Sequence, residues 1–396
     1  MKRRAFLKNS SIGVVGTSFM PQFLNSVDHL SLGKNDPILI VIQLSGGNDG
    51  LNTIIPYEND VYYNARPNLA IAKNEVLKIS DELGLNASMG GLHKLYMDGH
   101  VSIINSVGYP NPNRSHFRSM DIWHTATSGN VKSQTGWLGR YMDSYCKHAH
   151  DAIEVDSQLS LALNGVEKNG IAMIRSNSMD SMLGPSFFNR LQEHTSDYDL
   201  DEDNMGYLFK TFIDTKQSSK YLKESHNIKN NNYTFPRGKL GQKLGQVSQY
   251  IRSGFATKVY YISHTGFDSH ANQRNAQDRL LKEYSESVNA LVESLKKSGH
   301  FDHTLIMTFS EFGRRVKENA SKGTDHGKAN NVFLIGKDLK RKGIYNDGPD
   351  LLNLDDGDVK YNIDFRNIYQ DVIQDWFRQD ASKVISKRFD PLGIIG

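Results

Sequence analysis

Hydrophobic runs bounded by glycines and polar residues recur along the chain, and segments with helical spacing lie between them. Residues 37–44 read Pro-Ile-Leu-Ile-Val-Ile-Gln-Leu and are followed by a Ser-Gly-Gly turn sequence. An unbroken apolar run of this length is typical of a strand buried on both faces, as in a parallel sheet covered by helices. Similar runs occur at residues 101–107, 258–263, 303–309 and 331–335. We therefore predict a strand at each of these segments.

The segments between the runs favour helices. Residues 280–297 place apolar side chains on one helical face, namely Leu280, Tyr284, Val288, Leu291, Val292 and Leu295. This 3.6-residue spacing is that of an amphipathic helix. Strands that alternate with helices predict an α/β fold, a three-layer, doubly wound and mostly parallel sheet. Residues 180–237 are polar and lack strand signals, so we expect a helical insertion or cap there, with a mobile surface excursion as the alternative.

The N-terminus differs from the rest of the chain. Arg3 and Arg4 precede Ala-Phe-Leu-Lys and a small-residue apolar stretch from Ser10 to Met20. This arrangement resembles the twin-arginine signal, by which a translocase exports proteins already folded. We expect a leader at residues 1–32, one domain at 36–396, and a periplasmic or otherwise exported protein. The stretch is too short to span a bilayer alone, and with no evident cleavage site the leader is either removed or kept as an anchor.

Composition narrows the function classes. The 396 residues carry a net charge of +3, and the basic residues are spread among the acidic ones. This distribution indicates no nucleic-acid partner. A mean hydropathy of −0.53 predicts no integral membrane span in the mature chain. Cys146 is the only cysteine, so no internal disulfide can form and stability must come from a large core.

Acidic side chains and histidines gather where the predicted strands end. Those after or between strands are Asp49, Asp268, His270, Glu311, Asp325 and His326. The carboxyl ends of parallel strands meet at one edge of a sheet, so these side chains are expected to converge. Carboxylates together with imidazoles suit Zn²⁺ or Mn²⁺ better than Ca²⁺, which prefers oxygen alone. The pattern predicts a divalent metal site of unknown ion number.

Each residue alone has a plainer interpretation. Asp49 lies in a Gly-Asn-Asp-Gly string that is equally good turn chemistry. Asp268 and His270 could be a helix cap and a surface histidine. The coincidence of such groups at four strand ends is what favours the metal site.

Six short strings together resemble a known superfamily. They are Gly46-Gly47-Asn48-Asp49-Gly50-Leu51-Asn52, Arg114-Ser115-His116-Phe117, Gly136-Trp137-Leu138-Gly139-Arg140, Gly266-Phe267-Asp268-Ser269-His270, Ser310-Glu311-Phe312-Gly313-Arg314 and Gly323-Thr324-Asp325-His326-Gly327. The set, which spans essentially the whole mature chain, resembles the alkaline phosphatase-like superfamily of phosphatases and sulfatases. More narrowly, it resembles the uncharacterised branch DUF1501.

The resemblance implies roles for the strand-end residues. Asp49 would be a metal ligand, and Asp268 with His270 would hold another metal. Glu311 would stand where the superfamily has an aspartate, and His326 where it has a late metal-binding histidine. Asp325 would assist.

The resemblance also implies a hydroxyl nucleophile at a helix start. Ser115 is the candidate, because it follows a predicted strand and a Pro-Asn-Pro turn and precedes the helical residues 116–125. A simple N-cap serine is the alternative. Arg118, Arg314 and Lys328 lie near strand ends and could bind the substrate oxyanion, although each could equally be a surface charge.

The implied activity is hydrolysis of phosphate or sulfate esters by in-line displacement, on a small-molecule or glycan ester. Cys146 lacks the context needed for a formylglycine, which favours phosphate. Two departures support an alternative, a catalytically degenerate binding or structural protein of the cell envelope. Phe312 stands where active relatives have a histidine, and the Asp268-x-His270 spacing is shorter than usual.

Overall fold

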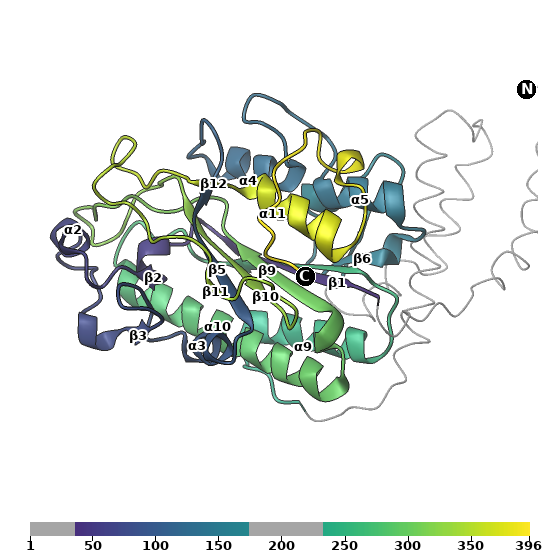
Figure 1. The fold of residues 1–396 in the computed structure, drawn as a ribbon, viewed down its shortest axis with the longest axis horizontal. Helices are drawn as coiled ribbons and strands as arrows, with labels where there is room; N and C mark the ends of the chain where they lie inside the picture. The colour runs from purple at the N-terminus through teal and green to yellow at the C-terminus, as the bar shows by residue number, and fades with distance from the viewer. Residues whose placement is uncertain (1–35, 174–232) are drawn as a thin grey trace, which may run out of the picture.

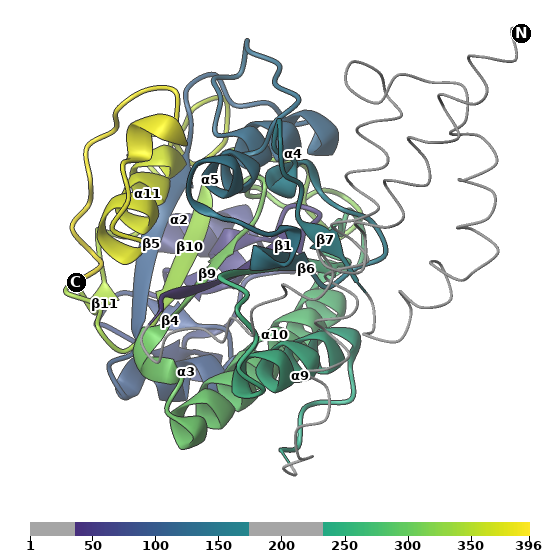
Figure 2. The same ribbon diagram turned by 90° about the vertical axis from the view of Figure 1, so that its right-hand side faces the viewer.

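The computed structural model describes residues 36–173 and 233–396. The expected leader at 1–32 and nearly all of the expected insertion at 180–237 lie outside these residues. In the described part of the chain, a nine-stranded sheet lies between two layers of helices (Figures 1 and 2). The predicted three-layer, mostly parallel α/β fold is therefore confirmed.

The large sheet has the strand order β11-β5-β10-β9-β1-β8-β6-β7, and β12 also pairs with β5. Its strands are β1 (Ile38–Ser45), β5 (Val101–Gly108), β6 (Ala152–Glu154), β7 (Ile171–Ala172), β8 (Val259–Thr265), β9 (Thr304–Phe309), β10 (Asn330–Ile335), β11 (Gly343–Ile344) and β12 (Ile363–Asp364). All five predicted strands are present. Strand β10 is antiparallel to both β9 and β5, while the other pairs in the sheet are parallel.

The antiparallel strand matters for the site. Because β10 runs against β9, the connection from residue 310 to residue 329 begins and ends at the same edge of the sheet. That edge also carries the residues that follow β1, β5 and β8. Loops distant in sequence therefore meet there.

Helices cover both faces of the sheet. They are α3 (Gly90–Met97), α9 (Lys239–Arg252) and α10 (Gln273–Ser298) on one face, and α4 (His116–Thr125), α5 (Trp137–Tyr145) and α11 (Phe365–Asp371) on the other (Figure 2). Strand β1 shows why both faces are covered. Ile40 and Ile42 join the core under α9 and α10, whereas Leu39 and Val41 join the core under α4 and α11. Alternate side chains thus point to opposite sides, and all four are apolar.

A smaller unit packs near the carboxyl ends of the strands. It contains the short helix α2 (Asp60–Ala65) and a three-stranded sheet of β2 (Ile54–Ile55), β4 (Gly84–Leu85) and β3 (Leu77–Lys78). Tyr57 and Tyr62 are buried in its apolar cluster. Among residues 36–173 and 233–396, none of the helices has the length and apolar character that crossing a membrane requires.

Candidate metal centre

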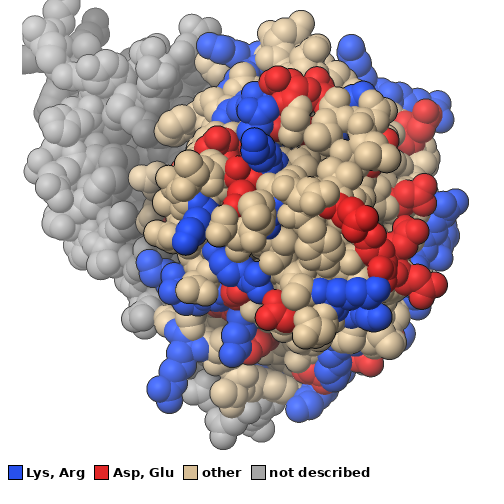
Figure 3. Space-filling model, turned by 90° about the vertical axis from the view of Figure 1, so that its left-hand side faces the viewer, with Lys and Arg blue, Asp and Glu red and all other residues tan. Residues whose placement is uncertain are grey.

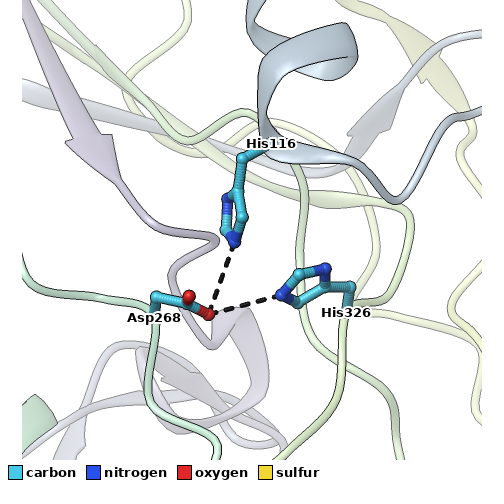
Figure 4. Close-up of side chains that lie close together, drawn as sticks. All are labelled: His116, Asp268 and His326. Carbon is cyan, nitrogen blue, oxygen red and sulfur yellow. Dashed lines mark hydrogen bonds and ion pairs between the residues drawn. The ribbon is translucent and has the colours of Figure 1, made fainter.

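Three side chains from different loops converge at the carboxyl edge of the sheet. His116 is the first residue of α4, Asp268 follows β8, and His326 precedes β10. One ligand atom from each lies within 4.8 Å of the others. Figure 4 shows both imidazoles directed at the same carboxylate. The strand-end prediction brought Asp268 and His326 together but did not include His116.

The distances suit a small tetrahedral ion. Asp268 Oδ1 lies 3.4 Å from His116 Nε2 and 3.3 Å from His326 Nε2. Ligand atoms at the usual Zn–N and Zn–O distances of a tetrahedral site are about 3.3 Å apart. Asp268 Oδ1 therefore already has, to each of these two imidazole nitrogens, the spacing that one bound ion would impose.

Hydrogen bonds turn both imidazoles toward the carboxylate. His116 Nδ1 donates to Glu311 Oε1 at 2.9 Å, and His326 Nδ1 donates to the Arg114 carbonyl at 2.7 Å. Both partners only accept, so each ring carries a proton on Nδ1, and a ring in its neutral form then presents a lone pair at Nε2. Metal-binding histidines are oriented in this way by carboxylates and carbonyls. His116 Nε2 is buried and makes no hydrogen bond with the described residues.

His270 adds a third imidazole to this group. Its Nε2 lies 2.9 Å from Asp268 Oδ1 and 2.9 Å from His326 Nε2. Its Nδ1 lies 3.4 Å from Asp325 Oδ1. If both rings carry their proton on Nδ1, two nitrogen lone pairs face each other, which is favourable only with a cation or a proton between them. We call His116, Asp268, His270 and His326 the His/Asp cluster.

The charges around the cluster shift its pKa values in different directions. Burial alone would raise the pKa of Asp268, but the hydrogen bond and positive charge of Arg314, together with the neighbouring imidazoles, outweigh it and lower the pKa to about 2. The hydrogen bond to Glu311 raises the pKa of His116. Burial lowers the pKa of His326 and keeps that ring neutral, as a ligand must be. An ionised carboxylate and a neutral imidazole are therefore available near neutral pH.

Two buried side chains hold the cluster in place. The Arg314 guanidinium is fully buried and donates to Asp268 Oδ1 at 2.8 Å. Its other hydrogen bonds go to the carbonyls of Gly46, Gly47, Phe267 and Thr324. The Phe312 ring packs 4.8 Å from the ring centroids of both His116 and His326. Arg314, predicted to bind substrate, thus has its donors engaged within the protein, and the Phe312 ring packs against both imidazoles.

A glycine makes room for this aromatic support. Gly47 has φ = +72°, and a Cβ there would lie 2.3 Å from the Phe312 ring. Only glycine fits both the backbone conformation and the close approach.

The structure does not bring Asp49 into the His/Asp cluster. Asp49 Oδ2 accepts from Arg66 Nη1 at 2.6 Å and from Gln273 Nε2 at 2.5 Å. Both side chains of the Asp49–Arg66 pair are fully buried. The Asp49 carboxylate accepts hydrogen bonds from a guanidinium and an amide, which cannot bind a metal. Imidazole nitrogens, which can bind a metal, face the Asp268 carboxylate. Asp49 thus has an internal counter-charge.

Glu311 contacts the His/Asp cluster through the His116 imidazole. Its carboxylate is fully buried and accepts from the Gly46 N–H at 2.8 Å as well as from His116. It orients an imidazole in this structure. Asp325 lies near His270 in the same way, with its carboxylate more exposed.

The remaining predicted residues lie around the edge of the site. Ser115 is the N-cap residue of α4, directly before His116, and its exposed side chain makes no capping hydrogen bond. Arg118 donates to the carbonyls of Gly129 and Val131. Lys328 pairs with Asp355 at 2.6 Å. Both cations have partners within the protein.

The sequence prediction does not include His116, although the string Arg114-Ser115-His116-Phe117 contains it. A hydroxyl and an imidazole are adjacent there, and the prediction assigns the functional role to the serine. The available signal was the position of His116 at the start of a helix that follows a strand end, the same rule that pointed to Asp268. The rule applies to any polar side chain at that place.

Fold and cluster together define an α/β protein with a candidate His/Asp metal centre at the carboxyl edge of its sheet. The family model described as "Protein of unknown function (DUF1501)" matches residues 36–378. The chain therefore belongs to this family. No curated protein matches the chain.

Several solved structures are distantly similar. A phosphonate monoester hydrolase from Silicibacter pomeroyi has a TM-score of 0.40 at 8% identity, covering 88% of this chain and 74% of that one. The periplasmic domain of EptC from Escherichia coli, in complex with Zn, has a TM-score of 0.38 at 8% identity, covering 77% and 74%. The PsFucS1 sulfatase from Pseudoalteromonas sp. has a TM-score of 0.35 at 10% identity, covering 87% and 69%.

Proposed function

We propose that the protein is an exported, metal-dependent hydrolase of phosphate or sulfate esters. One observation carries the metal dependence: the Nε2 atoms of His116, His270 and His326 lie 2.9 to 3.4 Å from Asp268 Oδ1, so three imidazole nitrogens and one carboxylate oxygen converge at one point. The ester class is supported by the resemblance of the sequence strings to the alkaline phosphatase-like superfamily. Zn²⁺ or Mn²⁺ suits the mixed nitrogen and oxygen donors best.

Each residue of the site has a separate proposed role. Asp268, His326 and His116 would hold the ion, with His270 beside them. An ion held there would polarise the ester oxygen and lower the pKa of a nearby hydroxyl. Ser115 Oγ would then attack phosphorus or sulfur in line, the alcohol would leave, and water would cleave the seryl ester to restore Ser115. Arg314 would keep Asp268 oriented.

The surface around the strand ends bears on how an anionic ester is recognised. Figure 3 views the molecule from the side toward which the carboxyl ends of β1, β8 and β9 point, and basic and acidic side chains are interspersed there. A broad positive field would be needed to steer anions from a distance. We therefore expect recognition to depend on groups close to the ion.

Metal content and turnover test the proposal together. Full-length protein loaded with Zn²⁺ or Mn²⁺ should retain the ion through gel filtration and hydrolyse p-nitrophenyl phosphate or sulfate. His326→Ala should lose both metal and turnover. His303→Ala is the matched control, because His303 lies before β9 at the opposite edge of the sheet. Absence of metal from the wild type would contradict the proposal.

The nucleophile requires a separate variant. Ser115→Ala should keep the metal and lose turnover, while Ser157→Ala, at another exposed serine, should keep both. Turnover that survives Ser115→Ala would remove Ser115 from the mechanism and leave the hydrolase.

A second candidate function is a catalytically silent binding protein. Phe312 favours it, because an aromatic ring without a donor atom packs against both His116 and His326. A chain that binds metal tightly and turns over no phosphate or sulfate ester would support this second function.

Export through the twin-arginine route is part of the first proposal and rests on the leader sequence. Replacing Arg3 and Arg4 by lysine should leave the protein in the cytoplasm of its host. The control variant Lys2→Arg, which keeps both arginines, should still be exported. Cell fractionation with immunoblotting measures the outcome. Export of the double-lysine variant at the wild-type level would contradict this route.

A further inference from the structure

We infer that the centre takes a single metal ion per chain, because Arg66 is a permanent internal cation for Asp49, the other aspartate at the same edge of the sheet. The inference rests on the proposed metal-dependent function and adds its stoichiometry. It assigns Asp49 and Arg66 to the framework of the site and not to its ligand set.

The contacts of Arg66 show that its guanidinium is fixed. Its Nη1 donates to Asp49 Oδ2 at 2.6 Å and to Asn52 Oδ1 at 2.9 Å. Its Nε and Nη2 donate to the carbonyls of Val316 and Arg315, each at 2.8 Å. No part of this side chain is exposed. The guanidinium therefore cannot move aside for an ion without leaving two backbone carbonyls unpaired.

The surroundings of Asp49 are also wrong for a metal. Besides Arg66, the Gln273 amide donates to its carboxylate, and the Gln277 amide donates to its carbonyl at 2.9 Å. These N–H groups complement an anion and repel a cation. A divalent ion beside Asp49 would also lie next to a guanidinium in a region without solvent, where the repulsion is weakly screened.

Asp268 provides the internal contrast. Arg314 donates to it as well, but its side chain is half exposed and three imidazole nitrogens face its Oδ1 atom. An ion there would be held by the carboxylate and the imidazole nitrogens, and the exposure of the site would let water reach it. Of the two aspartates, only Asp268 has both imidazole nitrogens around its carboxylate and access from solvent.

The number of ions bound by the wild-type chain tests the inference without any substitution. Metal-free full-length protein is titrated with Zn²⁺ by calorimetry, and the metal retained after gel filtration is measured by mass spectrometry. A stoichiometry of one ion per chain is expected. Two ions per chain would overturn the inference while leaving the metal-dependent function intact, whereas no bound ion would overturn both.

A double variant locates the ion relative to Asp49. Asp49→Asn combined with Arg66→Gln removes both charges of the pair and leaves no buried charge unpaired. This variant should still bind one Zn²⁺ with unchanged affinity, and His326→Ala should bind none. Weaker binding by a folded double variant, with its circular dichroism unchanged, would show that Asp49 is a ligand and overturn the inference. If the double variant does not fold, the wild-type count decides.

Discussion

Two aspartates at the same sheet edge have opposite surroundings. Asp49 forms an ion pair with Arg66, and both side chains are fully buried. Asp268 is half exposed and faces the nitrogens of three imidazoles. The buried pair neutralises its own charge, although Asp49 Oδ1 makes no hydrogen bond with the described residues, whereas Asp268 pairs with Arg314 and also faces imidazole nitrogens. Position at a strand end therefore selects candidate residues, and only the surrounding donors and acceptors separate framework from function.

The largest expected effect is on stability and comes from removing one charge of the buried Asp49–Arg66 pair. Asp49→Asn leaves the Arg66 guanidinium buried without its counter-charge, which should destabilise the fold by about 3–5 kcal/mol. Urea denaturation followed by circular dichroism measures the change. Asp302→Asn is the control, because Asp302 pairs with Lys337 on the surface and should lose less than about 1 kcal/mol. An equally small loss for Asp49→Asn would show that the two pairs are energetically alike.

Glu154, a buried acid that forms no ion pair with the described residues, extends the comparison. Glu154 ends β6 and accepts from the Ser160 N–H at 2.6 Å, and burial raises its pKa from 4.5 to about 7. The folded state therefore favours the protonated form. This contribution to stability is fully present below pH 4.5 and is lost as the pH rises to about 7.

The size of this effect follows from the shift. A change of this extent corresponds to about 3 kcal/mol of stability lost across that pH range. Glu154→Gln should remove this slope from the pH dependence of the unfolding free energy, whereas Glu293→Gln, at an exposed pair with Lys94, should not. An unchanged slope in Glu154→Gln would show that this carboxyl is ionised in the folded protein.

The smallest expected effect concerns metal affinity and comes from Glu311, which contacts the His/Asp cluster through His116. Glu311→Gln weakens the acceptor that orients His116, and loss of such supporting groups reduces metal affinity by about 10- to 100-fold. Calorimetric titration with Zn²⁺ measures the affinity, with Glu293→Gln as the control. Wild-type affinity in Glu311→Gln would mean that His116 is not a ligand.

The sequence predicted most of the sheet, because β1, β5, β8, β9 and β10 are long apolar runs buried on both faces. It did not predict β6 and β7, which have three and two residues and so present too little pattern. The direction of β10 was also beyond the sequence, since parallel and antiparallel strands buried on both faces have the same apolar composition.

The site was predicted to a lesser extent. The strand-end rule brought Asp268, His270 and His326 to one place, because all three lie in loops at the carboxyl edge. The same rule cannot recognise that Asp49 has a counter-charge. Arg66 follows the short helix α2 and reaches Asp49 through tertiary packing, and no spacing in the sequence signals that contact.

The most direct test of the central claim is the position of the metal in a crystal. Protein crystallised with Zn²⁺ should give one anomalous-difference peak, collected at the zinc absorption edge, at about 2.0–2.2 Å from Asp268 and His326. A peak beside Asp49, or no peak among His116, Asp268, His270 and His326, would contradict the account.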